Sequence, residues 1–153
     1  MIKLEIEHIR ETFHQMTRRL GLLDKNCCKV GDSYLSVTQS HILYQINKRR
    51  DPSMQDIADT LGIDITTFSR QIQTLVKLGL VVKTEHFEDR RIYVLSLSEE
   101  GAGVVRLISE QMNSYFQELF SNMTDFERDT VIKSIQLLNQ CLAKSGVCCS
   151  PLR

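Results

Sequence analysis

The sequence predicts a mainly α-helical fold with one small antiparallel β-hairpin. Two observations support this prediction. Apolar residues in segment 65–75 lie three, four and three positions apart, which is the spacing of one face of a helix. Segments 80–82 and 92–97 are rich in β-branched and aliphatic residues and flank a charged stretch, as the two strands of a hairpin do. Helical patterns at both ends of the chain make the helix the dominant element.

The first predicted element is an N-terminal helix with a heptad-like apolar seam. The seam consists of Ile2, Ile6, Ile9, Phe13, Met16 and Leu20. Spacings of four and three residues favour packing against a partner helix, so we expect residues 1–23 to be a dimerisation helix. Residues 24–33, and the tail from Ser145, are expected to be the flexible parts of the chain.

Two helices are predicted in the middle of the chain. Ser53 is expected to cap the first, whose packed face would consist of Met54, Ile57, Ala58 and Leu61. The second would bury Ile65, Phe68, Ile72 and Leu75. Its remaining face is polar and consists of Thr66, Thr67, Ser69, Arg70 and Gln73. Hydroxyl, amide and guanidinium groups read base edges and phosphates in the major groove, although an ordinary solvent-exposed helix would look similar.

A hairpin is predicted directly after this second helix. Gly79 is the expected stop of the helix. Residues 80–82 begin one strand, and residues 92–97 form the return strand. The segment 85–91 between them is too polar to belong to a core, so it is expected to form the hairpin tip.

The hairpin tip carries two adjacent arginines, Arg90 and Arg91. An arginine beside a polar helix can enter a minor groove or bind phosphate, and the preceding Asp89 can hold a guanidinium in place. A solvated tip is the alternative for the hairpin taken alone. Helix and hairpin together predict a DNA-binding winged helix-turn-helix in residues 36–98.

Two further helices are predicted after the hairpin. The apolar face of the first consists of Val105, Ile108, Met112, Tyr115 and Leu119, and that of the second of Val131, Ile135, Leu138 and Leu142. Thr124 and Glu127 between them have the spacing of a capping box. We expect residues 99–145 to complete the dimerisation helices of a single intertwined domain, residues 1–153, with packing inside one chain accounting for part of these faces. A two-fold homodimer would bind double-stranded DNA at an inverted-repeat operator.

Three short motifs resemble the MarR family of winged helix-turn-helix transcription regulators. The predicted polar helix ends in L-x-x-L-G-L-V at residues 75–81. Asp89-Arg90-Arg91 is similar to the family's D-x-R or D-R-R wing signature, and Leu97-Ser98-x-x-Gly101 is similar to its L-T-x-x-G. Serine in place of the commoner threonine is harmless, because both residues cap helices.

The resemblance implies a sequence-specific regulator of transcription. Repression is the usual action in this family, and activation is the alternative. It also implies which residues contact DNA. Bases or phosphates would face Thr66, Thr67, Ser69, Arg70 and Gln73, and the wing contact would come from Arg90 and Arg91.

Charge and hydropathy restrict how such a protein works. The chain has 19 basic and 19 acidic residues, and residues 48–91 carry eight basic against seven acidic side chains. Non-specific attraction to phosphate is therefore expected to be weak, so specificity should come from placed contacts. No secretion signal and no apolar run of about 18 residues is found, which predicts a cytoplasmic protein with no membrane partner.

Five cysteines form two adjacent pairs and one single residue: Cys27, Cys28, Cys141, Cys148 and Cys149. Adjacent Cα atoms lie about 3.8 Å apart, shorter than the roughly 4.4 Å that a disulfide needs, so neither pair suits an internal bond. By the family resemblance the two chain ends meet in the dimer. The pairs are then candidates to bind a soft metal or metalloid, or to be oxidised. The alternative is unpaired exposed cysteines, with Cys141 in the core.

A small aromatic ligand is the other candidate effector, in a pocket that the resemblance implies between the dimer helices and the winged part. Its candidate lining is Phe13, Met16, Tyr34, His41 and Tyr115, although core packing explains most of these residues equally well. We expect a homodimeric repressor released by such an effector, with no required cofactor, no assigned metal ligands and no enzymatic activity. A thiol-dependent redox enzyme and a helical protein-interaction adaptor are the alternatives. The first would need a base beside a thiol, and the second would leave the polar helix and the arginines without a role.

Overall fold

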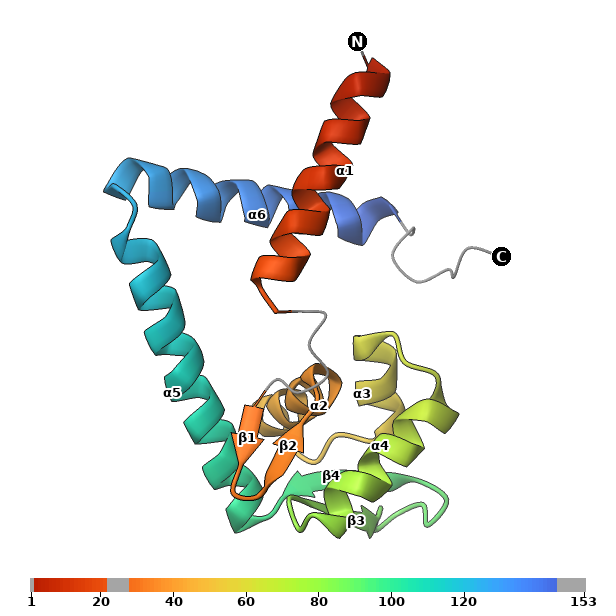
Figure 1. The fold of residues 1–153 in the computed structure, drawn as a ribbon. Coiled ribbons are helices and arrows are strands. Elements are labelled where there is room, and N and C mark those ends of the chain that lie inside the picture. Colours follow the sequence, from red (N-terminus) through yellow and green to blue (C-terminus); the bar gives the residue numbers. More distant parts are fainter. Residues whose placement is uncertain (1, 22–27, 146–153) are drawn as a thin grey trace. The chain divides into compact units, whose positions relative to one another are not determined.

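The structure, a computed structural model, describes residues 2–21 and 28–145, with side chains from Ile6 and from Lys29 onward in the two segments (Figure 1). The elements are α1 (Ile2–Arg19), β1 (Cys28–Val30), β2 (Ser33–Leu35), α2 (Val37–Lys48), α3 (Met54–Leu61), α4 (Ile65–Lys77), β3 (Val81–Glu85), β4 (Tyr93–Leu97), α5 (Glu99–Ser121) and α6 (Asp125–Ser145). The predicted mainly α-helical fold with a small antiparallel wing is confirmed. No described helix has the length and apolarity to cross a lipid bilayer.

The chain divides into two compact units. The N-terminal unit is Met1–Ile108 and the C-terminal unit is Ser109–Arg153. The boundary falls inside α5, so this helix contributes its first turns to one unit and its remaining turns to the other. That residues 1–153 act as a single intertwined domain stays a prediction.

The core of the N-terminal unit is built from α2, α3, α4, both β-hairpins and the start of α5. Its buried side chains are Leu35, Ile42, Leu43, Ile46, Met54, Ile57, Ala58, Phe68, Ile72, Leu75, Leu80, Val81, Leu95, Val104 and Val105. Burying one large apolar side chain contributes about 1.5–3 kcal/mol to folding, so this cluster fixes α4 and the β3–β4 hairpin relative to each other. In Figure 1, α4 lies beside that hairpin, which it contacts through β3.

The helices α2 and α3 begin at capping boxes. Ser36 caps α2 together with Gln39, and Ser53 caps α3 together with Asp56, which confirms the predicted cap at Ser53. The Arg49 side chain joins the two helices, because it donates to the Asp56 carbonyl at 3.2 Å and to Thr60 Oγ1 at 2.7 Å. These contacts hold the end of α2 against α3.

The first hairpin, β1–β2, corrects part of the expected flexible region. Residues 28–30 pair with residues 33–35 in an antiparallel register, where flexibility was expected for residues 24–33. The two-residue turn Gly31-Asp32 provides the reason, since Gly31 adopts a φ of 57° that favours glycine. Each strand has only three residues, too few to show an alternating pattern in the sequence.

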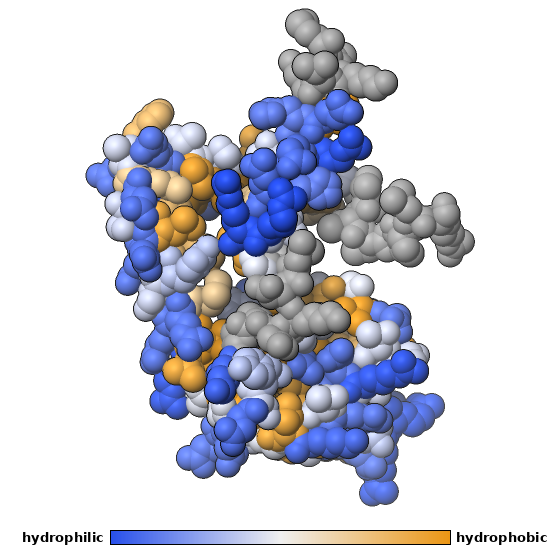
Figure 2. Space-filling view, viewed as in Figure 1, coloured by the Kyte–Doolittle hydropathy of each residue, from blue (hydrophilic) through white to orange (hydrophobic). Residues whose placement is uncertain are grey.

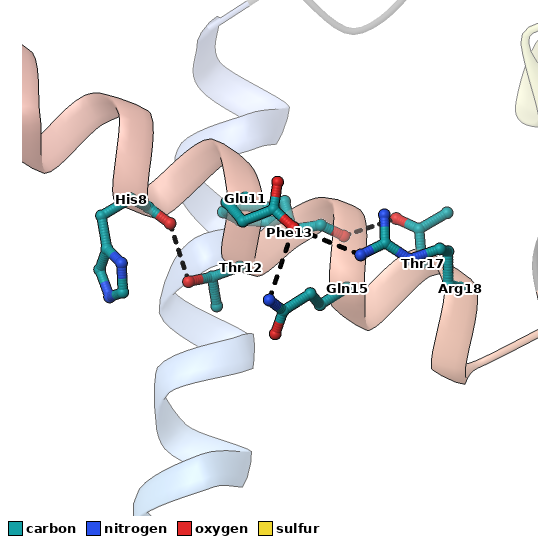
Figure 3. A network of polar contacts seen from close by, with 7 residues as sticks. All are labelled: His8, Glu11, Thr12, Phe13, Gln15, Thr17 and Arg18. Carbon is teal, nitrogen blue, oxygen red and sulfur yellow. Dashed lines mark hydrogen bonds and ion pairs between the residues drawn. The ribbon is translucent and has the colours of Figure 1, made fainter.

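The helix α1 carries hydrogen-bonded polar side chains on one face and an exposed apolar seam on the other. Glu11 accepts hydrogen bonds from Gln15 and Arg18 (Figure 3). The bond from Arg18, followed by that from Gln15, lowers the pKa of the Glu11 carboxyl. The described seam residues, all exposed in the single chain, are Ile6, Ile9, Phe13, Met16 and Leu20.

The helix α6 begins at the predicted capping box but buries none of its side chains within one chain. Glu127 Oε2 accepts from the Thr124 N–H at 2.9 Å, and Thr124 Oγ1 accepts from the Glu127 N–H at 3.3 Å. Cys141 is exposed and free, so its predicted core position is wrong for the isolated chain. The reason is that no side chain of α6 is buried among the described residues.

Candidate nucleic-acid interface

The polar helix α4 has clearly defined ends. At its start, Asp64 accepts from the Thr67 N–H at 2.9 Å, and hydrogen bonds from the side chain and backbone of Thr67 lower the pKa of the Asp64 carboxyl. At its end, Gly79 adopts a φ of 73°, and the Leu80 N–H bonds to the Leu75 carbonyl at 3.0 Å. The prediction that Gly79 stops this helix is confirmed.

The two faces of α4 differ as the sequence predicts, with one exception. Phe68, Ile72 and Leu75 are buried. Ile65 was expected in the same stripe but is 44% exposed, because it lies in the first turn beyond the packed part of the helix. The polar set is accessible: Ser69 is half-buried, and the exposed residues are Thr66, Thr67, Arg70 and Gln73.

The tip of the β3–β4 hairpin holds one arginine in place and leaves the other unrestrained by a described ion pair. Asp89 accepts from the Arg91 backbone N–H at 3.0 Å, from Arg91 Nε at 3.1 Å and from Arg91 Nη2 at 3.2 Å. These bonds lower the pKa of the Asp89 carboxyl. The predicted role of Asp89 in holding a guanidinium is confirmed, and the group it holds belongs to Arg91. Arg90 is exposed beside it.

Backbone contacts attach the hairpin to the helices around it. The Leu95 N–H donates to the Pro52 carbonyl at 2.9 Å, just before α3 begins. Val94 also forms an isolated bridge with Ser53. Sequence reasoning missed this attachment, because a main-chain hydrogen bond leaves no signature in side-chain patterns. The wing is therefore fixed against the helix-turn-helix, in the same unit as the polar face of α4.

Ser98 joins the end of α4 to the start of α5. Its hydroxyl donates to the Gly79 carbonyl and accepts from the Gly101 N–H at 2.9 Å, while its own N–H donates to the Leu80 carbonyl at 3.1 Å. The predicted cap at Ser98 is confirmed. A Cβ atom at Gly101 would lie 2.0 Å from the Leu80 carbonyl oxygen, so only glycine fits there.

The candidate effector residues are not brought together by the described part of the chain. Cys27, Cys148 and Cys149 lie outside the described residues, and Cys28 is described only as a backbone position of β1. Within residues 2–21 and 28–145, no group of three or more potential metal-ligating side chains is found. The aromatic-pocket candidates Phe13, Met16, Tyr34, His41 and Tyr115 are all exposed, so core packing within one chain does not explain them.

Comparison with known proteins finds a family model that matches this part of the chain. The MarR family model matches residues 35–93, the segment from the end of β2 to the start of β4. The HTH-type transcriptional regulator PapX of Escherichia coli is 31% identical over 90 residues, which are 59% of this chain and 49% of PapX. The chain thus spans about half the length of this curated relative.

Two solved structures share the fold. FabT of Streptococcus pneumoniae, solved in complex with DNA, gives a TM-score of 0.79 at 18% identity and covers 90% of this chain and 97% of its own. The transcriptional repressor CouR, bound to a 23-mer DNA duplex, gives a TM-score of 0.63 at 23% identity and covers 69% of this chain and 75% of its own. The MarR family match therefore falls on the same helix-turn-helix and wing tip whose contacts are described above.

Proposed function

We propose that this protein is a cytoplasmic, sequence-specific DNA-binding regulator of transcription that acts as a homodimeric repressor. The observation that carries the proposal is the exposed polar face of α4 in the same compact unit as the arginine-bearing wing. PapX is named a transcriptional regulator, and the FabT and CouR structures contain DNA, which supports the proposal.

In the proposed complex, α4 lies in the major groove. Its hydroxyl and amide side chains, together with Arg70, contact base edges and phosphates. The wing reaches the neighbouring minor groove or the backbone with Arg90 and Arg91. Because residues 48–91 carry eight basic against seven acidic side chains, general attraction to phosphate contributes little. Recognition then depends on where these few donors are held.

The homodimer is proposed from the exposed apolar faces of α1, α5 and α6. Figure 2 shows apolar side chains, in orange, at the surface over α5 and α6. Those on these two helices are Leu107, Met112, Tyr115, Phe116, Phe126, Ile132, Ile135, Leu137, Leu138 and Leu142. Soluble monomers rarely expose so many large apolar side chains on adjoining elements. A second copy with two-fold symmetry would cover them and present two α4 helices to an inverted repeat, about one helical turn apart.

The DNA contacts are tested by measuring affinity against salt, using the duplex that the wild-type chain selects from a randomised pool. Arg70→Ala should cost about 1–3 kcal/mol of binding and relax the sequence preference if this side chain reads a base. Arg90→Ala should weaken binding to all sequences and lower the salt slope by about one if it contacts phosphate. Lys133→Ala, which removes an exposed charge from α6, is the control. Unchanged affinity in both arginine variants would contradict the proposal.

Release by an effector is proposed from the cysteine pairs of the sequence, with a small aromatic ligand as the second candidate. The DNA titration is repeated with zinc, copper, arsenite, peroxide and salicylate. A variant with serine at Cys27, Cys28, Cys148 and Cys149 should lose the response to one of the thiol-reactive agents, while Cys141→Ser should keep it. If the fourfold variant responds normally to every agent, the thiol hypothesis is wrong. No catalytic step is proposed for this chain. The alternative, a thiol-dependent redox enzyme, would exchange thiols with a disulfide substrate over many turnovers in the absence of DNA.

A further inference from the structure

The wing tip carries an aromatic ring, that of Phe87, which lies almost entirely in solvent. Phe87 is 88% exposed, more than the 80% of Phe126, the other phenyl ring left largely in solvent among the described residues. Full burial of such a side chain would contribute about 1.5–3 kcal/mol to the free energy of folding, and an exposed ring does not make this contribution. Single exposed apolar residues are common on protein surfaces, so the position needs further evidence before it suggests a function.

The ring is held on an ordered part of the hairpin. The His86 N–H donates to the Ile92 carbonyl at 2.8 Å, which closes the tip, and His86 Nδ1 accepts from the Glu88 N–H at 3.2 Å. The imidazole of His86 stacks on the Phe87 ring with centroids 5.0 Å apart and an interplanar angle of 26°. A stacked ring on a closed tip loses little conformational entropy when it binds.

The charges at the wing tip cancel, so an apolar contact could add affinity for DNA that electrostatic attraction does not provide. Between residues 83 and 91 three basic side chains equal three acidic ones in number, so this segment has no net charge when His86 is neutral. Asp89 also occupies the guanidinium of Arg91. Attraction to phosphate therefore gives this wing little affinity for DNA. A contact that does not involve phosphate would add binding free energy that the charges do not provide.

We propose that Phe87 is a DNA-contacting residue whose ring enters the minor groove beside Arg90 and packs against a base step. This inference rests on the proposed function and adds to it a contact that does not depend on charge. Proteins that bind the minor groove insert apolar side chains of this kind between base steps, which partly unstacks the bases. Packing of a base on an aromatic ring is tolerant of sequence, so Phe87 would select groove shape and step flexibility.

The test compares Phe87→Ala, Phe87→Trp, Arg90→Ala and wild type on the duplex selected by the wild-type chain. We expect Phe87→Ala to weaken binding about 5- to 100-fold at every salt concentration, with the salt slope unchanged. Arg90→Ala should instead lower the slope by about one. Phe87→Trp should keep most of the affinity. With 2-aminopurine placed at the wing-contacted step, wild type should raise its fluorescence by unstacking it, and Phe87→Ala should not.

Phe126→Ala is the matched control, since it removes a similarly exposed phenyl ring from α6. Wild-type affinity for Phe87→Ala would overturn the inference while leaving the proposed function intact. An equal loss in Phe126→Ala with the oligomeric state unchanged would also overturn it. So would a shift of Phe87→Ala toward monomer in sedimentation, which would make a second copy the partner of the ring. If the wild-type chain selects no duplex, both the inference and the proposed function fail.

Discussion

The contact at Gly101 shows how closely α5 passes the end of α4. The Leu80 carbonyl oxygen occupies the place that any Cβ atom at residue 101 would need, at 2.0 Å. Two positions further on, at Gly103, the nearest neighbour to an added Cβ is the flexible tip of Arg106 at 3.9 Å. Two glycines in the same turn of one helix therefore serve different purposes.

Gly101→Ala should lower the free energy of unfolding in urea by about 1–3 kcal/mol, because the new methyl group forces apart two packed backbones. Gly103→Ala is its control and should raise that free energy by up to about 1 kcal/mol, since alanine is the better helix former and has room. Equal effects in the two variants would show that the contact between Leu80 and residue 101 is not rigid.

The helix α4 depends on a charged cap at its first turn. The folded-state pKa of Asp64 lies below the ordinary value of 3.8, because hydrogen bonds from Thr67 favour the carboxylate. A lowered carboxyl pKa stabilises the fold fully above the unfolded pKa, and this contribution is lost as the pH falls through the folded pKa. The presentation of the polar face should then weaken in acid, below a pH of about 3.8.

Asp64→Asn should keep the cap but remove this dependence, because asparagine caps helices about as well as aspartate and does not titrate. Thermal unfolding followed by circular dichroism between pH 6 and pH 2 should show a smaller acid-induced fall in melting temperature than in wild type. Asp64→Ala, which lacks a cap at every pH, should melt lower throughout. A variant curve parallel to wild type would contradict the assigned role of the carboxylate.

Large apolar side chains are exposed on α1, α5 and α6 among the described residues, and the proposed homodimer would cover them. Sedimentation equilibrium should therefore give twice the chain mass of 17.6 kDa. Phe13→Glu combined with Met16→Glu should yield monomers that bind the selected duplex more weakly, since one monomer engages only one half-site. Gln15→Glu is the control, because it adds a charge on the polar face of α1, near Arg18. A monomeric wild type with full affinity would refute the dimer.

Local signals in the sequence were sufficient for much of this structure. Ser53, Gly79, Ser98 and Thr124 lie at helix ends as predicted, because caps and stops depend on a few neighbouring residues. The stripe on α4 was predictable from its period except at Ile65, since a period does not reveal where packing ends.

Features that depend on distant segments were not predictable in the same way. The hairpin attachment of Leu95 to Pro52 is made by backbone atoms alone. The exposure of Cys141 goes with a helix, α6, none of whose side chains is buried in the described part of the chain. The polar residues of α4 could be named as candidates from their chemistry, and their exposure agrees with that choice, but which base each one faces depends on a DNA sequence that the chain does not encode.

The pairing of Asp89 with Arg91 has a consequence for how the protein would distribute itself over a chromosome. A regulator competes for its operator against roughly a million or more non-specific sites, whose hold on it comes from phosphate charge. In the proposed DNA complex, the bonds from Arg91 to Asp89 would reduce the attraction of the wing to the phosphates of random sequences. We expect a larger share of the molecules to be free to search, so that a small number of copies can keep an operator occupied.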